Sequence, residues 1–140
     1  MNSWPIVSAS ITRKFTATHS LTVAGGCNEP HPHDYTVRFG FRHEMVPGSG
    51  LVGSKPLCDW DADCRDAVAL VDGKDLNEVL APRPPTLEYL ALFLFSKLPA
   101  YYDWVECEAY EPIMTARIER QRGAKVEWLA ERAKGAGNEK

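Results

Sequence analysis

Three of the four histidines in this sequence lie close together. His19, His31 and His33 fall within fifteen residues, and Cys27 lies between the first two. On an extended strand, residues two positions apart point to the same face, so His31 and His33 can reach one metal ion. If His19 comes from a neighbouring strand, three nitrogens leave the fourth position of a tetrahedral zinc ion open, as in catalytic zinc sites. The alternative is a solvated turn beside a proline; the third histidine favours the metal site.

The composition limits what surrounds such a site. A chain of 140 residues predicts a single domain over residues 1–140 with a modest core. Its net charge of -3, without a basic block, predicts no nucleic-acid partner, whereas a small anionic molecule needs only a local pocket. No apolar stretch is long enough to span a bilayer, so we expect no membrane partner.

The first residues and the cysteines indicate the cellular compartment. Residues 1–6 lack the pattern of a secretory signal. The four cysteines show no CxxC spacing. We therefore expect free thiols in a cytoplasmic protein.

Hydrophobic periodicity predicts the elements that position the histidines. Alternating apolar residues predict strands over residues 6–18 and 34–44, joined by a loop over residues 21–32. The glycine- and proline-rich residues 45–56 predict an exposed loop that can line a site.

Helical spacing follows. It predicts a helix over residues 60–71, with Asp59 as its N-cap and Gly73 at its end. A second, largely buried helix is expected over residues 87–98, with Thr86 as its N-cap.

The remaining elements complete an α+β order of strand, strand, helix, helix, strand, strand. Residues 104–110 and 113–118 predict two strands, residues 125–134 a short amphipathic helix, and residues 135–140 a disordered end.

Short motifs around the histidines continue along the chain in one order. They are Phe15-Thr16-Ala17-Thr18-His19, Cys27 four residues before His31-Pro32-His33 with Tyr35 following, Asp59-Trp60, Asp72-Gly73-Lys74-Asp75-Leu76-Asn77, Pro85-Thr86-Leu87-Glu88, and Glu108. Together they resemble the 6-pyruvoyl-tetrahydropterin synthase and 6-carboxytetrahydropterin synthase family over about residues 9–120.

The resemblance implies a tunnelling fold, in which a four-stranded antiparallel sheet carries two helices between its second and third strands. The periodicity predicts the same order of elements. In the family, sheets from several subunits close into a barrel within a trimer-based homo-oligomer, usually a hexamer, with active sites at subunit interfaces. Closing the barrel removes exposed sheet edges.

The resemblance also assigns roles in a zinc-dependent carbon-oxygen or carbon-carbon lyase. His19, His31 and His33 would bind Zn²⁺, which makes protons of a dihydropterin substrate, such as 7,8-dihydroneopterin triphosphate, easier to remove. Cys27 would be the general base or acid, unless it is an inert buried thiol.

Two further residues would hold the pterin ring. Glu108 would accept hydrogen bonds from the ring's amino group and adjacent N–H, unless it is an ordinary outward-facing strand residue. Thr86 would complete the pocket, although a helix N-cap explains it equally well.

The chain departs from the family pattern at the proton relay. Asp72, implied to be catalytic, is followed by Gly73 where the family has a histidine, and a glycine side chain moves no proton. Pro32 replaces a glycine between the two histidines, and Ala109 replaces a threonine after the pterin glutamate.

Three interpretations remain open. The chain is a dihydroneopterin triphosphate lyase that uses Cys27 with Asp72, Glu29 or His43 in place of the missing histidine. Alternatively, it catalyses a different elimination or cyclisation on another substrate in specialised metabolism. The third alternative is an inactive zinc-containing binding protein.

Overall fold

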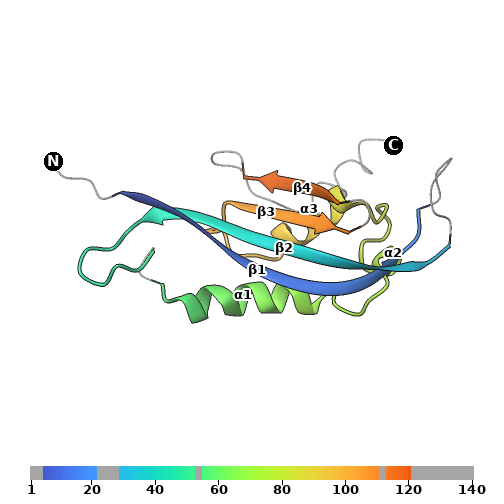
Figure 1. Ribbon diagram of the computed structural model, residues 1–140, viewed down its shortest axis with the longest axis horizontal. Coiled ribbons are helices and arrows are strands. Elements are labelled where there is room, and N and C mark those ends of the chain that lie inside the picture. The colour runs from blue at the N-terminus through green and yellow to red at the C-terminus, as the bar shows by residue number, and fades with distance from the viewer. Residues whose placement is uncertain (1–4, 22–28, 53–54, 111–112, 121–140) are drawn as a thin grey trace, which may run out of the picture.

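The computed structural model describes residues 5–21, 29–52, 55–110 and 113–120. Four strands form one antiparallel sheet in the order β1-β2-β3-β4 (Figure 1). The strands are β1 (Ile6–His19), β2 (His31–Glu44), β3 (Trp104–Ala109) and β4 (Met114–Glu119). Three helices, α1 (Leu57–Ala69), α2 (Leu76–Val79) and α3 (Leu87–Ser96), lie between β2 and β3 in the chain. The predicted α+β fold with a four-stranded antiparallel sheet is confirmed.

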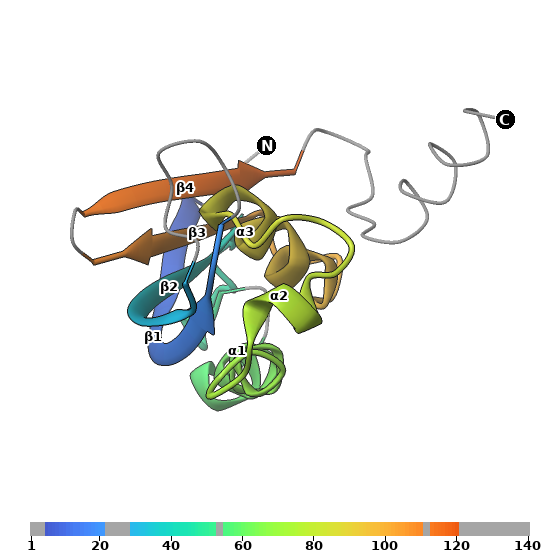
Figure 2. The same ribbon diagram turned by 90° about the vertical axis from the view of Figure 1, so that its right-hand side faces the viewer.

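The helices cover one side of the sheet, as Figure 2 shows. We call this side the core face. The alternating residues of β2 explain it, because Tyr35, Val37, Phe39 and Phe41 are buried against the helices. The opposite side, which carries Thr36 and Arg38 from the same strand, is the open face.

The structure extends the second strand beyond its predicted start. β2 begins at His31 rather than at Asp34, so the connecting loop ends earlier than expected. Pro32 is compatible with this strand because, among the described strands, β2 pairs there with β1 alone, and proline is tolerated at such an edge. Both histidines of the pair therefore lie on a strand.

The helix boundaries differ from the prediction in three places. α1 begins at Leu57 after an extended Pro56, and Asp59 lies in its first turn instead of capping it. Proline fixes the backbone angle φ and fits just before a helix, and Asp59 still complements the helix dipole. The helix ends at Ala69, before Gly73, and the four-residue α2 was not predicted because it is too short to show a period.

The second predicted helix is confirmed, with its last residue at Ser96. The Thr86 hydroxyl accepts a hydrogen bond from the Tyr89 backbone N–H at 3.2 Å, so Thr86 is the N-cap. The helix expected over residues 125–134 and the end at residues 135–140 lie outside the described residues. No helix in the described ranges is long and apolar enough to cross a membrane.

The segment after α1 covers the outer edge of β1. The Gly73 backbone N–H donates to the Thr16 carbonyl at 2.7 Å, and the Thr18 N–H donates to the Lys74 carbonyl at 3.0 Å. Gly73 has φ 72°, a backbone conformation that favours glycine. The segment therefore pairs an edge of the sheet that would otherwise be open at this point.

Candidate functional site

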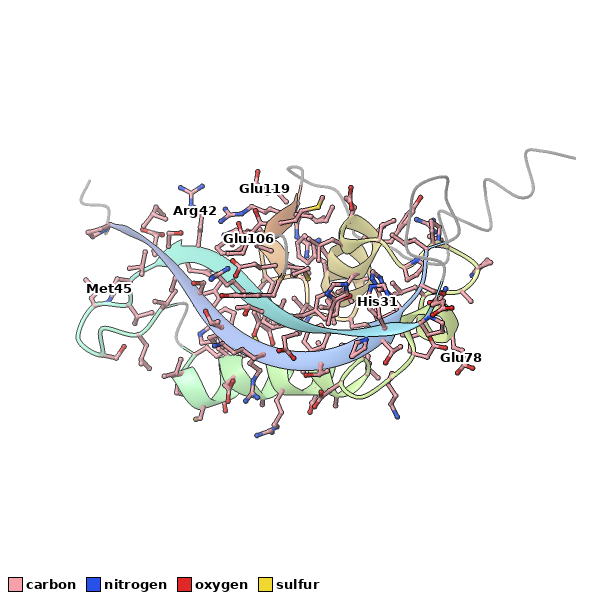
Figure 3. The ribbon with its side chains drawn as sticks, turned by 45° about the vertical axis from the view of Figure 1, so that its right-hand side comes forward. His31, Arg42, Met45, Glu78, Glu106 and Glu119 are labelled. Carbon is pink, nitrogen blue, oxygen red and sulfur yellow. The ribbon has the colours of Figure 1, made fainter. Side chains whose placement is uncertain are left out.

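The three clustered histidines lie on the core face, at the end of the β1–β2 pair. His19 is directly opposite His31, and Ala17 is directly opposite His33. Directly opposed residues of an antiparallel pair point to the same face, so all three imidazoles converge beyond the buried Tyr35. Figure 3 shows His31 at one end of the sheet and Met45 at the other, so the described residues 45–52 of the predicted loop start far from this cluster.

The ring nitrogens of the three histidines lie close enough together for one ion to bind all of them. The Nε2 atom of His31 lies 3.1 Å from that of His19 and 2.9 Å from that of His33. Tetrahedral zinc with Zn–N bonds of about 2.0–2.1 Å separates its ligand nitrogens by roughly 3.3 Å. All three side chains are half-buried, and among the described residues no carboxylate or thiol joins their group. The cluster thus offers three nitrogen ligands and leaves room for a fourth.

Two of the rings are oriented by backbone carbonyls. The Nδ1 atom of His19 lies 3.0 Å from the Pro85 oxygen, and that of His31 lies 2.9 Å from the Glu29 oxygen. A carbonyl can only accept, so each Nδ1 must carry the proton, and each neutral ring then presents a lone pair at Nε2. Two facing lone pairs cannot hydrogen-bond to each other. A cation between them satisfies both, so these residues fit a metal ion.

Burial also keeps His19 in the form that binds metal. Desolvation is the largest cause of a lowered pKa at His19, and the neighbouring His33 and His31 lower it further, against the hydrogen bond to the Pro85 carbonyl, which raises it. A lowered pKa favours the neutral imidazole.

Glu108 lies on the other side of the sheet. It is directly opposite Thr36, so its side chain points to the open face. Its Oε1 atom lies 3.4 Å from Nη1 of Arg38, which also donates to Glu106 at 3.2 Å. Arg38 and Glu108 line an open pocket of about 600 Å³ together with Lys14, Asp34 and other residues of β1 and β2. This volume suits a small molecule.

Comparison with known proteins identifies the family. The family model for 6-pyruvoyl tetrahydropterin synthase matches residues 8–122. The chain belongs to this family. A search of curated proteins finds no match.

Solved structures support the same fold. The 6-pyruvoyl tetrahydropterin synthase of Caenorhabditis elegans is similar with a TM-score of 0.74 and 22% identity, over 86% of this chain and 100% of that one. The Plasmodium vivax enzyme gives a TM-score of 0.60 and 12% identity, over 84% of this chain and 99% of that one. The Plasmodium falciparum enzyme gives a TM-score of 0.58 and 12% identity, over 85% of this chain and 99% of that one. At these identities, the likeness shows the fold of the 6-pyruvoyl tetrahydropterin synthase family.

The other residues to which the family resemblance assigns roles lie in different places. Cys27 lies outside the described residues. Thr86 follows Pro85, whose carbonyl holds His19, so the start of α3 lies beside the histidine cluster. Asp72 is exposed, and its Oδ1 atom accepts a hydrogen bond from the Thr16 backbone N–H at 3.3 Å, at the edge of β1. The structure thus brings Thr86 to the histidines and leaves Asp72 outside their group of ligand atoms.

Glu29 and His43 were, with Asp72, the residues considered as substitutes for the missing histidine. The Glu29 carbonyl holds the ring of His31. His43 lies near the far end of β2, where its Nε2 atom is 2.9 Å from the Tyr101 carbonyl. Neither side chain belongs to the group of potential metal ligands in the described residues.

The two faces meet at one open edge. β3 ends with Ala109 opposite Tyr35, whereas β2 continues to His31 and pairs there only with β1 among the described strands. Among the described strands, the edge of β2 beside His33 therefore has no neighbour on the side of β3.

Sequence reasoning missed two features of the site. Arg38 matches no motif in the sequence, but its two-residue spacing from Thr36, which lies opposite Glu108, puts it on the face that carries Glu108. The supporting carbonyl of Pro85 has no sequence signal, because any residue supplies a carbonyl.

Proposed function

We propose that this chain is a zinc-dependent lyase that acts on 7,8-dihydroneopterin triphosphate or a related heterocycle. The observation that carries the proposal is the convergence of three Nε2 atoms, with two of the rings held by backbone carbonyls, in a chain of the 6-pyruvoyl tetrahydropterin synthase family. Structural zinc sites normally close their ligand shell, whereas three ligands with an open position are typical of catalytic sites.

Bound at these histidines, zinc would act as a Lewis acid and make protons beside the substrate's side-chain oxygens easier to remove. His19 and His31 keep their lone pairs aimed at one point through the carbonyls of Pro85 and Glu29. Glu108 accepts N–H groups of the ring on the open face, and the substrate's side chain passes around the open edge of β2.

Cys27 accepts or donates the proton. A thiol needs a lowered pKa for this role near neutral pH, and a nearby cation lowers it. Gly73 supplies no imidazole, so the Asp72 carboxylate or a group of a neighbouring subunit must complete the proton transfer. Active sites at subunit interfaces of a homohexamer would provide such a group, and a neighbouring subunit would also cover the open edge of β2.

The test is to incubate zinc-loaded protein with 7,8-dihydroneopterin triphosphate and to identify the products by mass spectrometry. We expect the substrate to be consumed and triphosphate to be released. The Cys27→Ala variant should lose turnover and keep its zinc, which separates proton transfer from metal binding.

Failure of the test would also be informative. If zinc-loaded, assembled protein leaves the substrate intact, the proposed reaction is wrong. Conversion of a different heterocycle would then indicate altered chemistry, and binding without conversion would indicate an inactive binding protein. Full activity of Cys27→Ala would show that the thiol has no part in proton transfer.

A further inference from the structure

Arg38 occupies a central position on the open face. It lies directly opposite Glu106 on β3, and Glu106 lies directly opposite Arg117 on β4. Nη1 of Arg38 donates to Glu106 at 3.2 Å, and Nε of Arg117 donates to the other oxygen of the same carboxylate at 3.2 Å. Glu106 therefore interacts with two arginines, so its charge is partly neutralised by Arg117 even when Arg38 binds another group.

The contact of Arg38 with Glu108 is a weaker one. The distance of 3.4 Å from Nη1 to Oε1 is at the long end for a hydrogen bond, and it joins residues that are diagonal neighbours across the strands. Only Nη1 of Arg38 is hydrogen-bonded within the described part of the chain. A guanidinium has five N–H donors, so the other nitrogens can serve a ligand.

Glu108, an acceptor, and Arg38, a donor, lie side by side at the wall of one pocket. Oε2 of Glu108 has no hydrogen-bond partner among the described residues, and Arg38 lines the same pocket of about 600 Å³. A 2-amino-4-oxo ring presents, in a row along one edge, an amino N–H, a ring N–H and a carbonyl oxygen. The carboxylate matches the two N–H groups, and a neighbouring guanidinium matches the carbonyl, as arginine does at the O6 atom of guanine.

We propose that Arg38 is a specificity-determining residue, which donates a hydrogen bond to the 4-oxo group of a ring held by Glu108. This inference rests on the proposed function, because it assumes that Glu108 binds the ring. It adds a residue that selects rings whose 4-position is a strong hydrogen-bond acceptor. Lys14 and Asp34 also line the pocket, but neither has a hydrogen bond or ion pair with Glu108 in the described part of the chain.

The experiment compares two probes that differ only at this acceptor. Pterin and its 4-thioxo analogue share both N–H donors, and sulfur is a weak acceptor. We expect the wild-type protein to bind pterin about tenfold more tightly, which corresponds to one hydrogen bond with a charged donor. In Arg38→Met, the two dissociation constants should agree within about twofold.

Three variants make the comparison specific. Arg42→Met changes an arginine on the same strand and the same face (Figure 3 shows Arg42, Glu106 and Glu119). The Arg42 side chain lines a different pocket, with Trp104 and Glu119. This variant should keep the wild-type preference for pterin over the 4-thioxo analogue. Glu108→Gln should weaken the binding of both probes by the same factor. Arg38→Lys, which retains the cross-strand charge but loses the planar fork, should reduce the preference about threefold and provides the test if Arg38→Met fails to fold.

The outcomes separate this inference from the function on which it rests. If Arg38→Met keeps the full preference for pterin while Glu108→Gln weakens both probes, the role of Arg38 is wrong and the ring site stands. If wild-type protein binds neither probe, the inference and the proposed substrate class are both wrong.

Discussion

The histidine cluster and the Arg38–Glu108 pair lie on opposite faces of one sheet and are held in different ways. Each histidine lies on the β1–β2 pair, and backbone carbonyls orient two of the three rings. In the described part of the chain, the Glu108 carboxylate has one polar partner, a diagonal neighbour at 3.4 Å, at the wall of an open pocket. Within one chain the three histidines are therefore preorganised, whereas the Glu108 carboxylate is held by little. Metal binding should survive changes that abolish ring binding.

The largest effect is expected at His31, whose Nε2 atom contacts those of both other histidines. His31→Ala removes the central ligand and should weaken zinc binding by more than about 100-fold, because even loss of a group that supports a ligand costs 10- to 100-fold. Turnover should be lost with the metal. Zinc titration with a competing chelator measures the affinity.

The matched control is His43→Ala, which removes the fourth histidine. Its ring contacts the Tyr101 carbonyl, away from the cluster, so zinc affinity should not change. Equal losses in the two variants would contradict the assignment of the ligands.

An effect of intermediate size is expected at Glu108, and it should leave the histidines untouched. Glu108→Gln replaces one acceptor oxygen by an N–H donor, which should weaken pterin binding about 10- to 100-fold, the value of a hydrogen bond to a charged group. Isothermal calorimetry with pterin measures this change. Zinc content should stay at the wild-type level; a parallel loss of zinc would show that the two faces are not independent.

A smaller, structural effect is expected from Gly40, which lies opposite Trp104 on the open face. A Cβ atom at position 40 would lie 1.8 Å from the Trp104 ring, so Gly40→Ala must displace that ring and the Arg117 guanidinium stacked 3.8 Å from its centroid. We expect a loss of about 1–3 kcal/mol in the free energy of unfolding, measured in urea, with zinc binding unchanged.

A double mutant tests the cause of that loss. In a Trp104→Ala background the ring is absent, so the added methyl group at Gly40 should cost much less. The same cost in both backgrounds would show that the ring does not cover Gly40.

The smallest effect is expected at Gly73, which has φ 72°. Gly73→His restores the imidazole of the family pattern but should cost about 1–2 kcal/mol of stability, because side chains disfavour this conformation. Gly73→Asn, which tolerates it better, should cost less. Thermal unfolding of the two variants measures these costs. If Gly73→His and Gly73→Asn lose the same stability, the positive φ does not explain why glycine occupies this position.

Much of the fold could be predicted from the sequence because its strands alternate clearly. Tyr35, Val37, Phe39 and Phe41 identified the buried side of β2, and Thr86 identified the start of α3. The start of β2 could not be predicted, since Pro32 between the histidines is equally typical of a loop. The short α2 has no period to detect.

The candidate site was predictable where it depends on spacing along one strand. His31 and His33 share a face by the two-residue repeat alone, and the clustering of three histidines within fifteen residues pointed to His19. The pairing of Arg38 with Glu108 depends on the register between β2 and β3, which a single sequence does not contain. For the same reason, the placement of Glu108 on the face opposite the histidines could not be foreseen.

We propose that one chain holds a catalytic metal ion with three histidines. Elemental analysis of protein purified without chelators is the decisive measurement. We expect about one zinc ion per chain in the wild type and almost none in His31→Ala. A substoichiometric metal content that His31→Ala leaves unchanged would contradict it.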